Sequence, residues 1–342
     1  MKLHIGHDIN QNFLGVKTTA DLNELIKQGG FPGLVKLSEA YQDKRMVQIA
    51  DRITQEGKRI ILIAGPSSSG KTTFAKKLCV QLMVNGQNPL YLGTDDYFVE
   101  REDTPKDENG KYLFEDLEAV DVDLFNRNML DLLAGKEVDL PEFDFVTGHK
   151  NFGKRITKIE ANQPVVIEGI HALNDDLTPL IAKEDKFKIF ICPITAIKTN
   201  ENLGIEPIDH RMLRRMSRDY LYRDHSAAQT IAAWPDVRAG EEKNIFPFVD
   251  SADVQFNTSH IYEIAILKKY VWQLLLSITP DQPEYGKARE MLNFLRDFDT
   301  YADDDVVPND SILREFIGGS IYTDDEKEVA KCHVRNNNYR WV

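Results

Sequence analysis

The sequence predicts an α/β fold in which helices cover both faces of a doubly wound, mainly parallel, five-stranded sheet. Two observations predict it. Short apolar runs recur from residue 60 onward with helical stretches between them, a pattern typical of parallel strands that are buried on both faces. The first run leads through a loop rich in glycine and serine into a helical stretch. The expected strands are residues 60–64, 89–93, 165–168, 187–192 and 253–257.

The composition of the 342 residues, 42% hydrophobic and 28% charged, indicates a globular protein. Acidic residues outnumber basic ones by 55 to 42, and the net charge of −13 disfavours nonspecific binding to nucleic acid or anionic membranes. Cys79, Cys192 and Cys332 are too widely spaced for a disulfide framework or a zinc motif. The apolar stretches suit neither a signal peptide nor a membrane span. We therefore expect a cytoplasmic protein that binds neither nucleic acid nor membrane.

Residues 1–54 are expected to form a helical lead-in, with helices over residues 19–27 and 34–54. In the longer helix, apolar residues recur at helical spacing from Leu37 to Ile53 and would form one face. That face is expected to pack on the domain that follows.

Residues 55–258 are expected to form the central domain, in which a helix over residues 72–84 follows the first strand. A long insert, residues 97–162, separates the second strand from the third. Within the insert, KRITKIE (154–160) alternates with a period of two residues, which indicates a strand. We expect a small antiparallel β lobe there.

Residues 259–342 are expected to form a helical extension with helices over residues 261–278 and 283–301, separated by a break that contains two prolines. An apolar stripe from Ile264 to Ile278 is expected to lie in the core or to contact a second copy of the chain in a homo-oligomer.

A phosphate-binding loop follows the first strand. Residues 65–72 read GPSSSGKT and match G-x-x-x-x-G-K-[ST] between a strand and a helix. Glycines let backbone N–H groups turn inward around phosphate oxygens, and the next helix adds its positive dipole. Lys71 would reach the outer phosphates of ATP or GTP, and the Thr72 hydroxyl would bind Mg²⁺. The expected nucleotide-binding residues are Gly65, Pro66, Ser67, Ser68, Ser69, Gly70, Lys71, Thr72 and Thr73.

Acidic residues stand at the ends of the second and third strands. Asp95 and Asp96 follow the second, and Glu168 ends the third, at the sheet edge where ligands bind in open α/β folds. A carboxylate there can take the proton of an attacking hydroxyl and help to hold magnesium. We predict Asp95 as the base, and Thr72, Asp95 and Glu168 as metal ligands. The alternatives are that the aspartates cap the next segment and that Glu168 pairs with a lysine.

Five arginines lie within residues 209–224, on a stretch expected to be helical. Arg211, Arg214, Arg215 and Arg218 are three or four residues apart and would share a face. In phosphoryl transfer, such arginines neutralise charge on the moving group, so we predict a lid over residues 205–245. The alternative is a solvated charged helix.

Five motifs resemble, in order and spacing, those of the uridine kinase and phosphoribulokinase group of P-loop kinases. They are GPSSSGKTTF, TDDYF, LPEFDFVTGHK, VVIEGIHAL and HRMLRRMSRDYLYRD, within residues 58–258. The resemblance implies a P-loop NTPase fold and a phosphotransferase that moves a phosphoryl group from ATP or GTP to the 5′-hydroxyl of a nucleoside such as uridine or cytidine.

The resemblance also implies roles for individual residues. Asp95 matches the catalytic aspartate of the family, and His149 stands one place after the position of its base-contacting histidine. Matching aromatic and arginine positions complete the site. The expected substrate-binding residues are Asp95, Phe98, Phe114, Phe143, His149, Arg211 and Arg223, and the expected catalytic residues are Lys71, Asp95, Arg211 and Arg214.

The flanks are similar to a longer subgroup of bacterial uridine kinase-like proteins, which carry an upstream region like the N-terminal part of threonyl-tRNA synthetase. That region is not in this sequence, so we expect a short member or a fragment. Two other functions stay open. One is a kinase of another small alcohol, such as a sugar phosphate or pantothenate. The other is a nucleotide-dependent regulatory module, against which stands the lack of an N-K-x-D guanine-binding motif.

Overall fold

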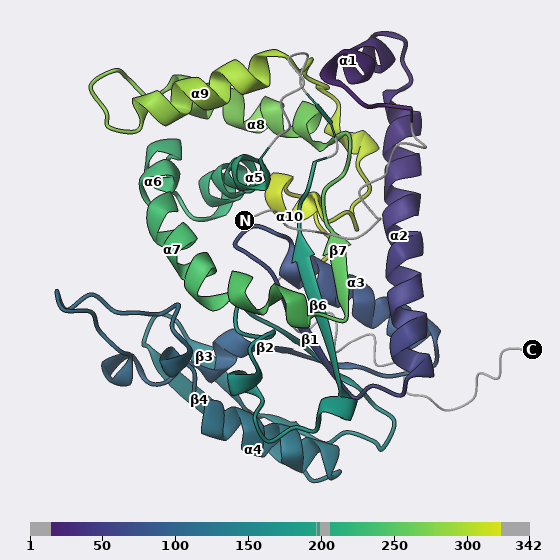
Figure 1. Cartoon of the computed structure of the whole chain (residues 1–342), viewed down its shortest axis with the longest axis vertical. Helices are drawn as coiled ribbons and strands as arrows, with labels where there is room; N and C mark the ends of the chain where they lie inside the picture. The colour runs from purple at the N-terminus through teal and green to yellow at the C-terminus, as the bar shows by residue number, and fades with distance from the viewer. Residues whose placement is uncertain (1–14, 196, 199–205, 323–342) are drawn as a thin grey trace, which may run out of the picture.

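The computed structural model describes residues 15–195, 197–198 and 206–322. At its centre, five strands pair in parallel in the order β2-β5-β1-β6-β7, which confirms the predicted sheet (Figure 1). The strands are β1 (Ile60–Ala64), β2 (Leu90–Gly93), β5 (Val165–Glu168), β6 (Lys186–Cys192) and β7 (Val254–Asn257). All residues of β1 and β6 are buried, which explains their lack of polar alternation.

Helices cover both faces of this sheet. The α-helices are α1 (Thr19–Lys27), α2 (Phe31–Gln55), α3 (Lys71–Val84), α4 (Val122–Leu133), α5 (Pro207–Tyr222), α6 (Ala227–Ala232), α7 (Trp234–Asn244), α8 (Glu263–Leu276), α9 (Tyr285–Arg296) and α10 (Arg314–Ile317). On one face Ile60 and Leu62 pack in a cluster with residues of α4, and on the other Ile61 and Ile63 pack with residues of α2 and α3. The alternating side chains of a single strand thus supply two separate cores.

Three helices differ clearly from expectation. Helix α9 ends at Arg296, five residues before its predicted end. Helix α2 begins at Phe31, three residues before the predicted start, because Pro32 fits the first turn of a helix instead of ending one. The insert that was expected to form only a β lobe also contains α4, whose first turn is capped by the Asp121 side chain, 3.0 Å from the Leu124 amide nitrogen.

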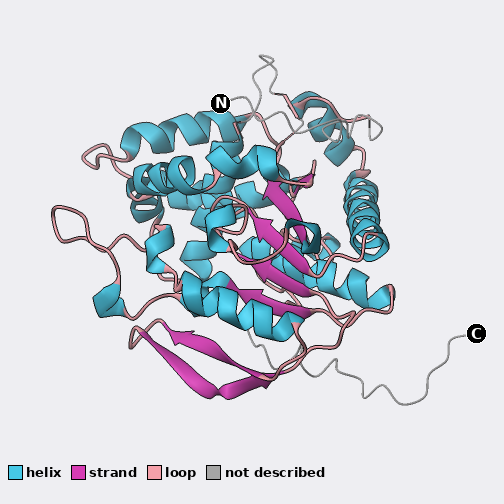
Figure 2. Ribbon diagram, turned by 60° about the horizontal axis from the view of Figure 1, so that its bottom comes forward, coloured by secondary structure: helices cyan, strands magenta, loops and turns pink. Residues whose placement is uncertain are grey.

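The expected antiparallel lobe is present as a hairpin of β3 (Val138–Asp144) and β4 (His149–Thr157). Figure 2 shows this two-stranded sheet beside the main one, below α4 in that view. The hairpin places the end of the insert next to the segment that follows β2, because β3 contacts residues 94–97.

The flanking segments pack together around α5. Residues of α1, of the start of α2, and of α5, α8 and α9 form one hydrophobic cluster. These helices lie in the upper half of Figure 1. The ring of Phe31 stacks on that of Tyr301 with 4.0 Å between centroids. Asn23 donates a hydrogen bond to the backbone oxygen of Asp297 at 2.8 Å. The N-terminal and C-terminal flanks therefore support each other.

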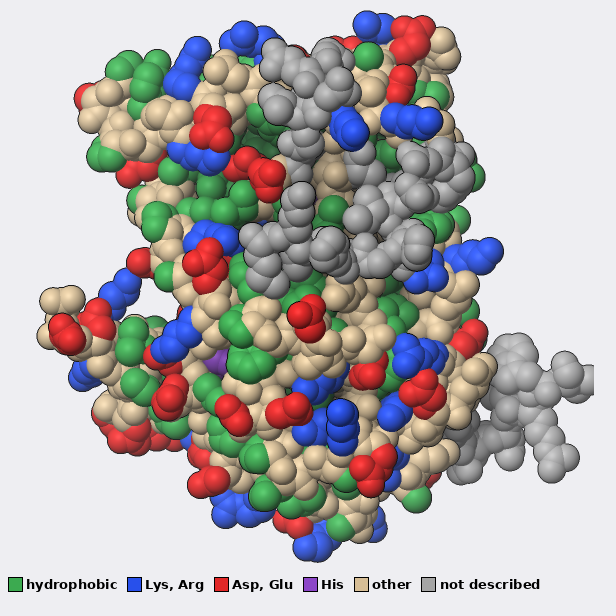
Figure 3. Space-filling model, viewed as in Figure 1, with side chains coloured by type: hydrophobic (Ala, Val, Ile, Leu, Met, Phe, Trp, Pro, Cys, Tyr) green, Lys and Arg blue, Asp and Glu red, His purple; other side chains and the backbone are tan. Residues whose placement is uncertain are grey.

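Within the described ranges, no helix has both the length and the apolar character that crossing a membrane requires. On the face seen in Figure 3, acidic and basic side chains are interspersed with apolar ones. Of the three cysteines, Cys79 and Cys192 are buried thiols, and Cys332 lies outside the described residues.

Candidate active site

The phosphate-binding loop joins β1 to α3 in a conformation that its glycines permit. Gly70 has a φ of 87° and begins α3 from the left-handed region. At Gly65 a Cβ atom would lie 2.3 Å from the backbone oxygen of Ile191, so any larger residue would collide with β6. The Lys71 ammonium donates to the Gly65 oxygen at 3.0 Å and so folds back on the loop.

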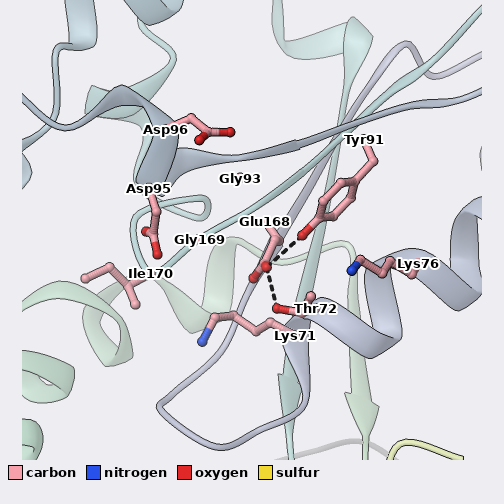
Figure 4. Close-up of a pocket in the computed structure, with 10 residues that line it drawn as sticks. All are labelled: Lys71, Thr72, Lys76, Tyr91, Gly93, Asp95, Asp96, Glu168, Gly169 and Ile170. Atoms are coloured by element: carbon pink, nitrogen blue, oxygen red, sulfur yellow. Dashed lines mark hydrogen bonds between the residues drawn. The ribbon is translucent and has the colours of Figure 1, made fainter. Parts of the chain in front are cut away.

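A cavity of about 260 Å³ opens beside this loop, where α3 begins and where β2 and β5 end (Figure 4). Its lining residues are Lys71, Thr72, Lys76, Tyr91, Gly93, Asp95, Asp96, Glu168, Gly169 and Ile170. The structure therefore brings Lys71, Thr72, Asp95 and Glu168, which were singled out from separate motifs, to one cavity. It lies at the carboxyl edge of a parallel sheet, as expected for a ligand site.

Glu168 holds two hydroxyl groups inside the cavity. Its Oε1 atom accepts hydrogen bonds from the Thr72 hydroxyl at 2.6 Å and from the Tyr91 hydroxyl at 3.0 Å. Desolvation and the Glu168 carboxylate raise the pKa of Tyr91 well above its usual value, so this phenol stays a donor. A hydroxyl and carboxylates are the oxygen ligands that Mg²⁺ prefers, so Thr72, Glu168 and Asp95 fit such an ion. Tyr91 was not among the predicted site residues, because its only signal in the sequence is a hydroxyl within an apolar strand.

The two neighbouring aspartates have different surroundings. Asp96 accepts a hydrogen bond from Arg155 at 2.7 Å and is turned away from Lys71 (Figure 4). Asp95 faces the Lys71 side of the cavity (Figure 4). Water reaches Asp95 through the opening, but the surrounding protein desolvates it and Glu168 repels its charge, so its pKa rises to about 6.

Three arginines of α5 contact the phosphate-binding loop. Arg211 pairs with Glu241 of α7 and donates a hydrogen bond to the backbone oxygen of Ser67 at 3.1 Å. Arg215 donates to the Ser67 hydroxyl at 3.0 Å. Arg211 is only 1% exposed, so this face of α5 is not the solvated surface considered as the alternative.

Arg214 is completely buried and makes a second connection to the loop. It donates to Glu263 Oε2 at 2.8 Å and to the Ser69 oxygen at 3.2 Å. His210 lies 2.8 Å from Glu263 as well. The Arg214 guanidinium, and to a lesser extent His210, lower the pKa of Glu263 despite its burial, so Glu263 is an anion that anchors Arg214. Neither Arg211 nor Arg214 lines the cavity.

Comparison with known proteins gives the family. A model of the Phosphoribulokinase / Uridine kinase family matches residues 60–265, more than half of the chain. The chain belongs to this family. It is a P-loop kinase, a phosphotransferase that acts on an alcohol group.

Individual relatives match the kinase over about half of its length. The uridine kinase of Ligilactobacillus salivarius (strain UCC118) is 30% identical over 178 residues, 52% of this chain and 74% of the relative. The uridine kinase of Chloroflexus aurantiacus (strain ATCC 29366 / DSM 635 / J-10-fl) is 28% identical over 198 residues, 58% and 85% of the two chains. Inorganic pyrophosphatase TTM2 of Arabidopsis thaliana is 31% identical over 138 residues, 40% of this chain and 19% of the relative.

The aromatic residues predicted around the acceptor of this kinase lie in two places. Phe98 and Phe143 are in edge contact, with centroids 5.6 Å apart, and Phe145 packs on both. Phe145 was missed, although it stands two residues after Phe143 in the same motif. Phe114 instead packs on Tyr112.

The loop that carries Phe114 contacts α7. Asn244 donates to the backbone oxygen of Glu115 at 2.7 Å, and Lys243 pairs with Asp116 at the same distance. Earlier in the same loop, Lys111 pairs with Asp236 at 2.7 Å. These contacts join the insert to the segment that was predicted to be a lid.

The other predicted site residues have partners outside the cavity. His149 begins β4 and its Nδ1 atom lies 2.7 Å from Glu100 Oε2. Arg223 is exposed at the end of α5 and lies 3.5 Å from Asp219. Thr73, in the first turn of α3, donates its hydroxyl hydrogen bond to Glu315 of α10 at 2.7 Å.

Proposed function

We propose that this kinase phosphorylates the 5′-hydroxyl of a nucleoside of the uridine or cytidine type, with ATP or GTP as donor and with Mg²⁺. The observation that carries the proposal is that Lys71, Thr72, Asp95 and Glu168 line one cavity, where their side chains suit a phosphate, a metal ion and a proton to be accepted. The uridine kinases among its relatives support a nucleoside as acceptor.

The roles follow from the chemistry of phosphoryl transfer, which depends on positioning and electrostatics. Asp95 accepts the proton of the attacking hydroxyl, which its pKa of about 6 permits at neutral pH. Lys71 turns from the Gly65 oxygen to the outer phosphates. Thr72, Glu168 and Asp95 would hold Mg²⁺, which would neutralise charge on the phosphates.

Arg211 and Arg214 were predicted to neutralise charge on the moving group. Their buried pairing with Glu241 and Glu263 supports a different role as positioning residues. By holding the carbonyl groups of residues 67–69, they fix the shape of the loop whose N–H groups bind phosphate.

The acceptor enters between the insert and the lid in this proposal. Phe98 and Phe143 pack against the base or ribose, and Phe114, His149 and Arg223 come to the substrate when the loop and lid close on it. The kinase domain then comprises residues 55–258, with an acceptor lobe over residues 97–162 and a lid over residues 205–245. The described parts of the flanks, residues 15–54 and 259–322, support it.

A panel of acceptors tests the proposal. The kinase is mixed with ATP or GTP, Mg²⁺ and one acceptor at a time, from pyrimidine and purine nucleosides, sugar phosphates and pantothenate, and each product is identified by mass. We expect one pyrimidine nucleoside to gain a single phosphoryl group with turnover far above that without acceptor. The corresponding 5′-deoxynucleoside is the matched control and should stay unmodified.

Phosphorylation of a sugar phosphate or pantothenate alone would show that the acceptor is another small alcohol. Nucleotide hydrolysis that no acceptor changes would favour a regulatory module.

A further inference from the structure

The C-terminal extension packs directly on the start of the phosphate-binding helix. Ile312 and Phe316 are fully buried in the cluster that contains Phe74 of α3. A Cβ atom on Gly70 would lie 2.5 Å from Ile312 Cγ2, so the extension is in close contact with the loop backbone. Ser217 of α5 donates to the Phe316 oxygen at 2.8 Å. Helix α10 is therefore fixed beside the loop from two sides.

This packing places a carboxylate on groups that bind phosphate in a P-loop. Glu315 Oε2 accepts a hydrogen bond from the Thr73 hydroxyl at 2.7 Å and a longer one from the Thr73 amide at 3.4 Å. The amide belongs to the first turn of α3, where N–H groups have no partner within the helix. In the G-x-x-x-x-G-K-[ST] loop, such N–H groups cradle the inner phosphates of the nucleotide.

We infer that Glu315 is a resident anion in the donor site, which a nucleotide must displace from Thr73 before its innermost phosphate can bind. The inference rests on the proposed use of a nucleoside triphosphate. A carboxylate and a phosphate cannot share the same donors, because both are acceptors and both are negatively charged. Since Phe316 and Ile312 anchor α10 in the core, the Glu315 side chain moves and the helix stays. Glu315 therefore lowers the affinity of the kinase for its donor.

The test compares nucleotide affinity in Glu315→Gln with that in the natural chain, by calorimetric titration with ATP and with GTP in the presence of Mg²⁺. We expect Glu315→Gln to bind the donor roughly five- to fiftyfold more tightly. Asp310→Asn is the matched control, because it removes the same charge from the same segment. Asp310 contacts Lys77, which retains Asp43 at 2.9 Å, so this variant should bind within about twofold of the natural chain.

Two further measurements test the inference even if Glu315→Gln does not fold properly. Glu315→Asp retains the charge but withdraws it from Thr73 by one methylene group, and it should tighten binding in the same direction by less. Inorganic pyrophosphate is the second probe. It can occupy the outer phosphate positions and leave Thr73 to Glu315, so Glu315→Gln should improve its affinity less than that of ATP.

The inference is wrong if the natural chain binds the donor and Glu315→Gln binds it equally well or more weakly. The proposed function would then stay intact. Equal tightening by Glu315→Gln and Asp310→Asn would overturn it as well, because net charge alone would explain the gain. If neither the natural chain nor Glu315→Gln binds ATP or GTP, both the inference and the proposed donor are wrong. Binding by Glu315→Gln alone would support the inference in its strongest form.

Discussion

Asp95 and Asp96 are neighbours in the sequence, yet the fold gives them different chemistry. Arg155 neutralises Asp96, whereas desolvation and Glu168 hold the pKa of Asp95 near 6. A carboxylate with a pKa close to neutrality is a better proton acceptor than one near its ordinary value of 3.8. The environment thus distinguishes two side chains that the sequence presents as a pair.

Phosphoryl transfer should depend on pH through Asp95. This carboxyl must be ionised to accept a proton, and its pKa is raised, so activity should be level above about pH 6 and fall as the pH drops below it. The measurement is kcat/KM for the acceptor from pH 4.5 to 8 at saturating donor. Asp95→Asn should lower kcat by roughly 10²- to 10⁴-fold and remove this dependence.

Asp96→Asn serves as the control for that profile, because it removes the adjacent carboxylate without removing the base. Its inflection should move only slightly, toward lower pH, because the charge of Asp96 is the smallest of the causes that set the pKa of Asp95. Activity that stays level down to pH 4.5 would show that the pKa of the base is not raised, and an Asp95→Asn rate within a fewfold of the natural one would assign the proton to another group.

The residues at strand ends could be predicted because motif and position agree on them. Thr72, Asp95 and Glu168 each follow from a strand or helix boundary that the sequence marks clearly. The partner of the neighbouring Asp96 could not be predicted in the same way. Arg155 stands 59 residues after Asp96, and which of many arginines reaches a given carboxylate depends on how the insert folds back.

At the level of single elements, the arginine spacing of α5 correctly predicts that these side chains share one face, but it does not predict that part of this face is buried. The burial of that face depends on Glu241 and Glu263, which are 30 residues from Arg211 and 49 from Arg214. Helix α4 was missed for a different reason. The alternation of residues 154–160 led to a β assignment for the whole insert, although Asp121 followed by an amphipathic stretch is a helix start.

Removing Arg214 should destabilise the kinase strongly, because it leaves the charge of Glu263 buried and unpaired. We expect Arg214→Met to lower the free energy of unfolding by roughly 3–5 kcal/mol. The double variant Arg214→Met/Glu263→Leu should regain part of the loss. Chemical denaturation measures both. In the control, Lys136→Ala breaks an exposed pair with Asp131 and should cost less than about 1 kcal/mol.

A small effect of Arg214→Met, similar to that of Lys136→Ala, would show that the guanidinium is not held as described. Loss of donor affinity at unchanged stability would instead place Arg214 among the groups that contact the nucleotide.

Across the whole molecule, the strands of the sheet and the order of the motifs could be predicted from the sequence. The packing of the N-terminal flank against the C-terminal flank could not. Periodicity gives each helix its apolar face without identifying the helix that covers it. The cluster around α5 joins residues near both ends of the described chain, and the contact between Thr73 and Glu315 spans 242 residues. A local sequence pattern does not identify contacts between residues this far apart in the chain.

The kinase should therefore not tolerate loss of its C-terminal extension. A chain that ends at residue 282 loses α9, α10 and the segment between them, and with these the fully buried Leu295, Leu313 and Phe316. Each such side chain contributes about 1.5–3 kcal/mol, and a whole domain is stable by only about 5–15 kcal/mol. We expect no cooperative thermal unfolding for this variant. A chain that ends at residue 322 is the control, since it keeps every described helix. Equal melting temperatures would show that residues 1–282 are stable without α9 and α10.

The stacking of Phe31 on Tyr301 has a consequence for synthesis on the ribosome. Translation proceeds at about 5–20 residues per second, so Phe31 waits for roughly a quarter of a minute to a minute before Tyr301 is made. Until then α2 has an uncovered apolar end, and the nascent chain is open to aggregation or to capture by chaperones. The phosphate-binding loop is translated early, but α10, which packs against it, is among the last segments to emerge. A half-made chain would thus contain the whole nucleotide-binding motif without the structure that shapes it.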